Sequence, residues 1–289
     1  MSICFGKSRV SHDQCVPASR QIAQPTNARL SFYAFLVLGL SPSPFLLGQS
    51  AAIATEIVPP TAIGKVGQVD SSALNQINQH LLAVGNVAWT GMQGKGQITY
   101  RVDKTSSPAS LTILGDHCFR LDVQSANGTQ STRIDGRLGK MQGTDGRIDS
   151  LSPDTASSGL VQFPVLRTTD FTSRSVSLTD QGLASGDGLA LHRLRMETGA
   201  VTVKTGAPKP KTTVTDFYFD PKTNLLIKST NSIRLAGSGS NQIRVTTYED
   251  YRQVNGSMIP FRFTQSLDGQ VLWTLQLADA QLSTDKQKA

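Results

Sequence analysis

Apolar and polar residues alternate along most of the chain in short runs. Successive side chains of a β-strand point to opposite faces, so such alternation predicts strands with one apolar and one polar face. The C-terminal third shows the pattern most clearly, with expected strands at 214–220, 225–235, 243–254, 259–267 and 271–282. Earlier strands are expected at 97–102, 111–114, 118–123, 129–134, 138–142, 175–183 and 189–197. The fold class is therefore predicted to be mainly β, with a few helices.

Dipeptides typical of tight turns separate these runs. They are Asn127-Gly128, Asp135-Gly136, Asp145-Gly146, Asp187-Gly188, Asn255-Gly256 and Asp268-Gly269. Asn-Gly and Asp-Gly supply the positive φ angles that two-residue hairpin turns need. Hairpins join strands that are neighbours in sequence, and a long antiparallel sheet of this kind twists and curls. We therefore predict a strongly curved antiparallel meander sheet, a half-barrel, with helices on its concave side.

One segment has a helical period. Asp70 offers an N-cap, and behind it Leu74, Ile77 and Leu81 recur at three- and four-residue steps, which predicts a helix over residues 71–84 that ends at Gly85. Its apolar stripe is expected to lie against the sheet, and His80 is expected at the surface or at the boundary. Residues 150–170 interrupt the strand pattern and are expected to hold a second, short helix.

The N-terminal 50 residues resemble a secretion signal. Residues 1–29 carry four basic groups and one acid, an apolar run follows at 30–40, and small residues surround positions 48–54. This order predicts a signal peptide over residues 1–50 with an extended n-region, cleaved after Ser50 or after Ala54. The alternative is a membrane anchor, although the apolar run is shorter than the roughly 20 residues that span a bilayer. We expect a linker at 51–70, one domain at 71–283 and a polar tail at 284–289.

Charge and cysteine content narrow the class of protein. The net charge is +7, and without residues 1–50 the chain has 24 basic and 20 acidic residues. The basic residues are scattered, which argues against nucleic acid as a partner. After signal cleavage only Cys118 remains, so no internal disulfide is expected. These features fit a periplasmic or secreted protein whose membrane contact is peripheral at most.

The sequence offers little catalytic chemistry. It has no His-Glu-x-x-His, Gly-x-Ser-x-Gly or Cys-x-x-Cys motif, and the one glycine-rich run, at residues 91–96, precedes a strand instead of opening a helix. His117 and Cys118 are adjacent, so on a strand their side chains should diverge. Asp216 and Asp220 share a face and are expected to be solvated. We therefore expect no enzyme activity, no metal and no cofactor.

Two segments resemble hairpins of the outer-membrane lipoprotein-sorting superfamily, the group of LolA-like carriers. Residues 216–225 read Asp-Phe-Tyr-Phe-Asp-Pro-Lys-Thr-Asn-Leu, similar to that group's D-P-x-T-x-L hairpin. Residues 248–261 read Tyr-Glu-Asp-Tyr-Arg-Gln-Val-Asn-Gly-Ser-Met-Ile-Pro-Phe, similar to its Y-x-D-Y-x-x-V-x-G-x-x-x-P-F hairpin. The resemblance is specific over about 214–282. It implies a half-barrel whose concave apolar side takes up acyl chains, and its motifs are structural and hold no catalytic residue.

The resemblance and the alternation together lead to a functional expectation. We expect an exported, non-enzymatic cell-envelope protein that binds a lipid or an acylated protein in an apolar cavity. The expected lining residues are Phe217, Phe219, Ile227, Val245, Phe261, Phe263, Trp273 and Leu275. Two alternatives stay open: an interaction module with a packed interior that docks other envelope proteins, and a hydrolase with an unfamiliar site.

Overall fold

The computed structural model describes residues 68–85, 89–115, 118–136, 138–151, 176–186, 188–198, 213–234 and 241–283. The expected signal peptide, the helix expected at 150–170 and the polar tail lie outside these residues, except for the first two positions of the helix segment. The described residues form one helix, α1, and thirteen strands. None of the described helical structure is both long and apolar enough to cross a membrane.

The N-terminal group of strands is a meander of six. It consists of β1 (Gly91–Tyr100), β2 (Ser106–Leu114), β3 (Cys118–Ser125), β4 (Gly128–Asp135), β5 (Leu138–Gln142) and β6 (Ile148–Leu151). Each pairs antiparallel with its sequence neighbour. Alternate residues are buried because one face of the meander is packed, as β2 shows with Ala109, Leu111 and Ile113.

The C-terminal group is a meander of seven longer strands. It consists of β7 (Val176–Gly186), β8 (Leu189–Thr198), β9 (Thr213–Phe219), β10 (Leu226–Arg234), β11 (Asn241–Val254), β12 (Ser257–Leu267) and β13 (Gln270–Ser283). Two of its hairpin turns, β11–β12 and β12–β13, use expected dipeptides. Asn255 and Gly256 have φ of 48° and 84°, and Asp268 and Gly269 have φ of 47° and 78°, as a turn with two positive φ angles requires.

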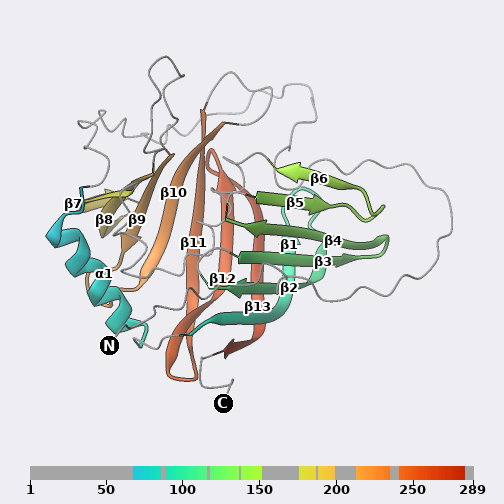
Figure 1. Ribbon diagram of the computed structural model, residues 1–289, viewed down its shortest axis with the longest axis horizontal. Helices are drawn as coiled ribbons and strands as arrows, with labels where there is room; N and C mark the ends of the chain where they lie inside the picture. The colour runs from blue at the N-terminus through green and yellow to red at the C-terminus, as the bar shows by residue number, and fades with distance from the viewer. Residues whose placement is uncertain are drawn as a thin grey trace, which may run out of the picture. The chain divides into compact units, whose positions relative to one another are not determined.

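The two meanders form one sheet because the first strand pairs with the last. The strand order is β6-β5-β4-β3-β2-β1-β13-β12-β11-β10-β9-β8-β7, so β1 and β13 join the groups in the interior of the sheet. In Figure 1 the strands β3–β6 run nearly crosswise to β9–β12, which shows how strongly the sheet twists. The sheet is antiparallel throughout and does not close into a barrel, which confirms the predicted half-barrel. The pairing of β1 with β13 is the one strand contact that hairpin reading alone does not give.

A β-bulge shapes the junction between β1 and β13. Lys95 pairs with Asp279 and Gly96 with Leu277, so Ala278 is the extra residue. A Cβ on Gly96 would meet the backbone of Gln276 and Leu277. The glycine-rich run at 91–96 therefore serves close strand packing, and it lies inside β1.

Helix α1 (Ser71–Ala83) lies within one residue of its predicted bounds. The Asp70 side chain accepts a hydrogen bond from the Ser72 amide at 3.2 Å and caps the first turn. Just before the helix, Val69 forms a parallel bridge to Leu178 of β7. At the other end, Val84 accepts a backbone hydrogen bond from Met258 at the start of β12. The helix therefore runs from edge strand β7 to the β11–β12 turn (Figure 1).

The predicted apolar stripe of α1 lies against the sheet. Ile77 is fully buried, and Leu74 and Leu81 pack against the core. The buried face also includes Ala73, Gln76 and His80. His80 was expected at the surface or boundary and is instead buried, because it makes a polar contact to the β9–β10 turn, described below.

Gly85 is expected to be the most sensitive glycine in the helix–sheet connection. Its φ is +101°, and a Cβ there would collide with the Gly256 carbonyl oxygen of the β11–β12 turn. Gly85→Ala should lower the free energy of unfolding by about 3 kcal/mol, because backbone strain and a backbone clash add. Gly136→Ala is the matched control, since its φ is +57° but nothing lies within 4 Å; it should cost about 1 kcal/mol. Urea unfolding of both variants measures the difference, and equal losses would contradict the close contact.

Candidate ligand-binding face

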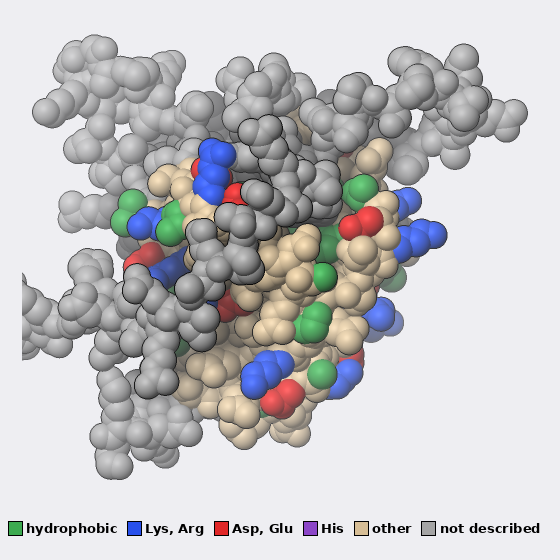
Figure 2. Space-filling view, turned by 90° about the vertical axis from the view of Figure 1, so that its right-hand side faces the viewer, with side chains coloured by type: hydrophobic (Ala, Val, Ile, Leu, Met, Phe, Trp, Pro, Cys, Tyr) green, Lys and Arg blue, Asp and Glu red, His purple; other side chains and the backbone are tan. Residues whose placement is uncertain are grey.

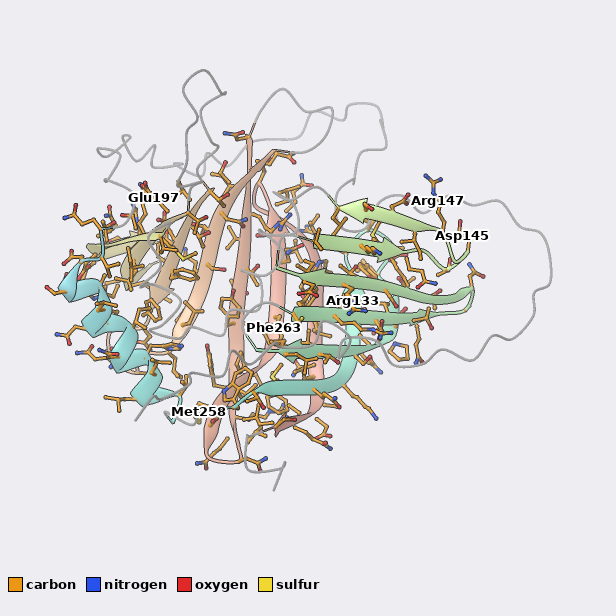
Figure 3. All side chains as sticks on the ribbon, viewed as in Figure 1. Arg133, Asp145, Arg147, Glu197, Met258 and Phe263 are labelled. Atoms are coloured by element: carbon orange, nitrogen blue, oxygen red, sulfur yellow. The ribbon has the colours of Figure 1, made fainter. Side chains whose placement is uncertain are left out.

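Six of the eight expected lining residues lie together in the core. Phe217 and Phe219 of β9, Phe261 and Phe263 of β12, and Trp273 and Leu275 of β13 are all buried in one hydrophobic cluster. The same cluster includes Ala73 and Ile77 of α1, so the helix covers part of this face. We call it the inner face of the sheet. In Figure 3, Phe263 lies on β12 near the place where the two groups of strands meet.

The remaining two, Ile227 and Val245, are half-buried and outside the cluster. Ile227 sits at a register shift between β9 and β10, where Leu226 takes the buried position instead. Val245 is paired with Thr230 and Ser266, and this row continues to Asp216 on the outer face. The register therefore contradicts the expectation that Val245 lines the inner face. For Ile227, which has no cross-strand partner, that expectation stays a prediction.

The error in β11 has a physical cause. Its buried residues are Arg244, Thr246 and Tyr248, while Ile243, which shares the face of Val245, is 50% exposed. The apolar parity of this strand faces outward, because the pairing with β10 and β12 fixes the register and a strand's faces alternate strictly. Polar residues of β11 thus occupy the inner positions, where the hydropathy pattern predicts apolar side chains.

On the inner face, residues that pair across adjacent strands form three rows, and these rows become more polar with distance from α1. The row nearest α1 is apolar and contains Tyr248, Phe263 and Leu275. The middle row runs Leu194, Phe217, Ser229, Thr246, Gln265 and Trp273. The row farthest from α1 runs Met196, Thr215, Asn231, Arg244 and Leu267. The inner face is therefore amphipathic, apolar toward the helix and hydrogen-bonding toward the other end.

The polar positions are buried as deeply as the apolar ones. Thr215 and Gln265 are each 1% exposed, Arg244 is 3% and Asn231 is 6%. Ser229 Oγ lies 2.8 Å from Tyr248 Oη, which satisfies one of these groups within the protein. By contrast, Thr215 Oγ1, Asn231 Nδ2 and Gln265 Nε2 are buried and have no hydrogen-bond partner among the described residues. A buried polar group without a partner costs free energy, so this part of the face calls for an explanation.

The hairpin that carries the first family-like motif holds the helix in place. Asp220 accepts hydrogen bonds from Lys222 N and Thr223 Oγ1, and Asn224 adopts φ of 56°. The Asn224 carbonyl oxygen then accepts a bond from His80 Nδ1 at 2.9 Å, and Gln76 Nε2 donates to Asn224 Oδ1 at 3.3 Å. Asp220 therefore stabilises a turn that docks α1, which is a more specific role than the solvated carboxylate predicted.

The second family-like motif is also structural. Tyr248 is fully buried against Phe263 in an edge-to-face contact with ring centroids 6.1 Å apart. The Tyr251 hydroxyl donates to the Leu226 carbonyl oxygen at 2.6 Å. Burial raises the pKa of both phenols. Tyr251 therefore connects β11 to β10, and Tyr248 packs β11 against β12. This agrees with the prediction that the motif places aromatic residues and makes a turn.

A His–Asp pair lies at the N-terminal end of α1 but lacks the order of a catalytic triad. His192 Nε2 is 2.8 Å from Asp180 Oδ1. Burial of Asp180 raises the pKa of its carboxyl group. Hydrogen bonds from Gly182, His192 and Ser72 lower this pKa by more, so the net shift is downward. A nucleophile must contact the histidine, whereas Ser72 bonds to the carboxylate. The hydrogen bond from Ser72 to Asp180 therefore connects the start of α1 to β7.

The described residues contain no cluster of three or more His, Cys, Asp or Glu side chains that could hold a metal ion. His117 lies outside them, so its expected divergence from Cys118 stays a prediction. Asp216, predicted to be solvated, is instead almost buried on the outer face and receives two hydrogen bonds from Arg195 at 2.8 and 3.0 Å. Arg–carboxylate pairs of this bidentate kind fix strand positions more than they create reactivity.

The outer surface near β3–β6 has no large apolar patch in view. Figure 2 shows hydrophobic side chains scattered singly among polar atoms, with Lys and Arg gathered along one edge. Isolated exposed apolar side chains are normal on a protein surface. The contiguous apolar cluster of the described residues lies on the inner face, which makes that face the candidate binding surface.

Comparison with known proteins supports the fold. A domain of an outer membrane lipoprotein-sorting protein from Vibrio parahaemolyticus aligns over 74% of this chain and 93% of its own, with a TM-score of 0.50 and 10% identity. A LolA superfamily protein from Nitrosomonas europaea covers 75% of this chain and 96% of its own at 14% identity, with a TM-score of 0.47. No family model and no curated protein matches the sequence.

The chain therefore has the fold of the lipoprotein-sorting class, which confirms at the level of fold the resemblance seen in its two hairpins. At 10% identity the match does not carry over binding residues. The polar end of the inner face must accordingly be judged on its own chemistry. Its sequence signal is the order Gln242, Arg244, Thr246, three polar residues at alternate positions of β11.

Burial of His80 predicts a pH-dependent stability. Burial lowers its pKa from 6.5 to about 4, although the bond to Asn224 opposes this. The unfolded chain binds the proton first, so stability present above pH 6.5 should fall as the pH drops toward 4, by about 3 kcal/mol in all. His80→Gln keeps a donor for Asn224 and removes the titration. Unfolding of both proteins across pH 7.5–4.5 tests this; parallel curves would contradict a neutral buried imidazole.

The two sides of the sheet should respond differently to truncation. Phe217→Ala removes a ring that is 1% exposed and should cost about 3–5 kcal/mol. Val245→Ala changes a half-buried outer side chain and should cost about 1 kcal/mol or less. Thermal or urea unfolding of the two variants measures the contrast. A larger loss for Val245 would show that the register of β11 differs from the one described.

Proposed function

We propose that this chain is an exported, non-enzymatic protein of the cell envelope that binds a lipid or a lipidated ligand against the inner face of its half-barrel. The supporting observation is the amphipathic inner face itself. It is a continuous apolar surface built from β1, β9, β12 and β13, and it leads into buried polar groups that the described residues leave unpaired. An apolar tail with a polar end matches that order of surfaces.

The binding energy would come mainly from burial of the tail. Removing apolar surface from water contributes about 25 cal/mol per Å², without any directional chemistry. Phe217, Phe263 and Leu275 supply such surface on three different strands. The absence of a triad order at Asp180 and His192 supports a binding role over a hydrolytic one.

A second candidate function is an interaction module with a packed interior. The observation that favours it is the tightness of the cluster, in which Phe219 and Leu275 are fully buried. In this case the inner face would be filled by the protein's own residues, and envelope proteins would dock elsewhere, for example at edge strands β6 and β7.

Tryptophan quenching by a brominated fatty acid separates the two. The chain has two tryptophans, Trp89 and Trp273. Trp273 is buried on the inner face, and Trp89, which precedes β1, is partly buried and packs against the same cluster. Ligand in the proposed position should quench Trp89→Phe protein strongly, because Trp273 remains. Trp273→Phe protein should be quenched less, because Trp89 is the less deeply buried of the two.

Native mass spectrometry of protein purified from membranes without denaturant should show a bound lipid. Protein that carries no added mass and shows no saturable quenching would contradict the carrier role and favour the packed module.

A further inference from the structure

A row of three cations crosses the outer face of the N-terminal strands. Arg120 of β3 pairs with Arg133 of β4 (Figure 3), and Arg133 pairs with Lys140 of β5. Each cation is one position away from a buried residue of its own strand, so all three lie on the face opposite the core. Like charges directly opposite each other destabilise a sheet. The row therefore points to a role other than folding.

The acids on this face of β3 and β4 neutralise the row only in part. Asp122, two residues after Arg120, pairs with the Arg120 Nε at 2.8 Å. Asp135 lies two residues after Arg133, on the other side of the row. Arg133 and Lys140 form no ion pair with any described residue. These two side chains are therefore available to an anion from outside the protein.

Exposed aliphatic side chains flank the row on the same face. Leu138 lies two residues before Lys140 on β5 and is 75% exposed. Ile148 of β6 is 60% exposed and is paired with Gln142, two residues after Lys140. Because same-face neighbours of a strand are roughly 7 Å apart, the two aliphatic side chains lie on opposite sides of the cations. Cations between exposed aliphatic side chains are typical of surfaces that lie on membranes.

This combination favours an anionic membrane over an acidic protein as the partner. The side chains on one face of a sheet stand at a similar height, so several of them can meet a plane at once. Lys and Arg can reach phosphate groups while their carbon stems stay in the apolar layer. Leu138 and Ile148 gain free energy on entering hydrocarbon, whereas a protein partner would need an apolar pocket for each of them.

We propose that the outer face of β3–β6 docks the protein onto an anionic phospholipid surface through Arg133, Lys140, Leu138 and Ile148. The inference goes beyond ligand binding on the inner face and does not depend on it, since the two surfaces lie on opposite sides of the sheet. Each Lys or Arg close to an anionic membrane strengthens association about fivefold. Docking is therefore reversible, and salt weakens it, because exposed charges are screened over about 10 Å at 0.1 M ionic strength.

The test is sedimentation of the mature chain with lipid vesicles, because the apolar run at 30–40 would bind membranes by itself. Vesicles of phosphatidylcholine are compared at low ionic strength with vesicles of equal parts phosphatidylcholine and phosphatidylglycerol. The wild-type protein should partition about tenfold more strongly onto the anionic vesicles, and added salt should remove most of this difference. Equal partitioning onto both kinds of vesicle would overturn the proposal.

Two double variants separate this face from the overall charge of the protein. Arg133→Gln with Lys140→Gln should weaken partitioning onto anionic vesicles about tenfold or more. The control is Arg101→Gln with Lys104→Gln, which removes the same charge from the exposed β1–β2 turn and should change partitioning less than about twofold. Equal weakening by both would overturn the site.

Lys140→Gln alone keeps the test valid if the first double variant does not fold, because Lys140 is exposed. This variant should weaken partitioning onto anionic vesicles about threefold or more. Partitioning equal to that of the wild-type protein would overturn the site.

The apolar part of the surface is tested separately. Leu138→Ser with Ile148→Ser should weaken partitioning onto anionic vesicles about fivefold and leave its salt dependence intact, since the cations remain. Unchanged partitioning would show that the aliphatic side chains do not enter the membrane and would overturn their part in docking.

Poly-glutamate separates a membrane partner from an acidic protein. Retention of the protein on poly-glutamate that depends on Lys140, without partitioning onto vesicles, would overturn membrane docking in favour of an acidic protein partner. None of these measurements involves a ligand of the inner face. Their failure therefore leaves the proposed lipid-binding function to tryptophan quenching, and failure of quenching leaves membrane docking intact.

Discussion

The structure depends on the antiparallel pairing of β1 with β13. Every other pair of adjacent strands in the sheet consists of sequence neighbours, which alone would form two separate meanders of six and seven strands. The pairing of the first strand with the last makes one sheet, and the bulge at Gly96 allows the close approach of the two backbones. Bulges increase local twist and bend a strand. One continuous inner face, and with it any binding surface that spans both groups, follows from this contact.

The helix adds a second constraint at one end of that face. It is fixed at three points: at β7 through Val69, at the β9–β10 turn through His80 and Asn224, and at β12 through Met258. These contacts place its apolar residues over the apolar rows of the sheet. The polar row with Arg244 lies toward the opposite strand ends. The inner face therefore changes from apolar near the helix to polar at its other end.

The sequence predicted the fold well because its signals are local. Asn255-Gly256 and Asp268-Gly269 require positive φ angles, and Asp70 followed by a three- and four-residue apolar period specifies a capped helix. The pairing of β1 with β13 is not local, since about 180 residues separate the two strands. The short strand β6 was also not predicted, because four residues give too brief a period.

The candidate site was predicted only in part, for a reason that Val245 and Arg244 illustrate. Parity was assigned from hydropathy, so Ile243 and Val245 were placed inside and Arg244 outside. The register that β10 and β12 impose reverses this order in β11. Hydropathy fails where a buried face is polar, and such faces are expected at functional sites. For β12 and β13, where the inner face is aromatic and aliphatic, the same method identified Phe261, Phe263, Trp273 and Leu275 correctly as buried.

The central claim is that a ligand tail lies against the inner face. Photo-crosslinking with a diazirine-bearing fatty acid, followed by peptide mass spectrometry, tests it directly. The account predicts adducts on inner-face residues of β12 and β13, around Phe263 and Leu275, that an excess of unlabelled fatty acid abolishes. Adducts confined to outer-face positions such as Val245, or adducts that no competitor displaces, would contradict it.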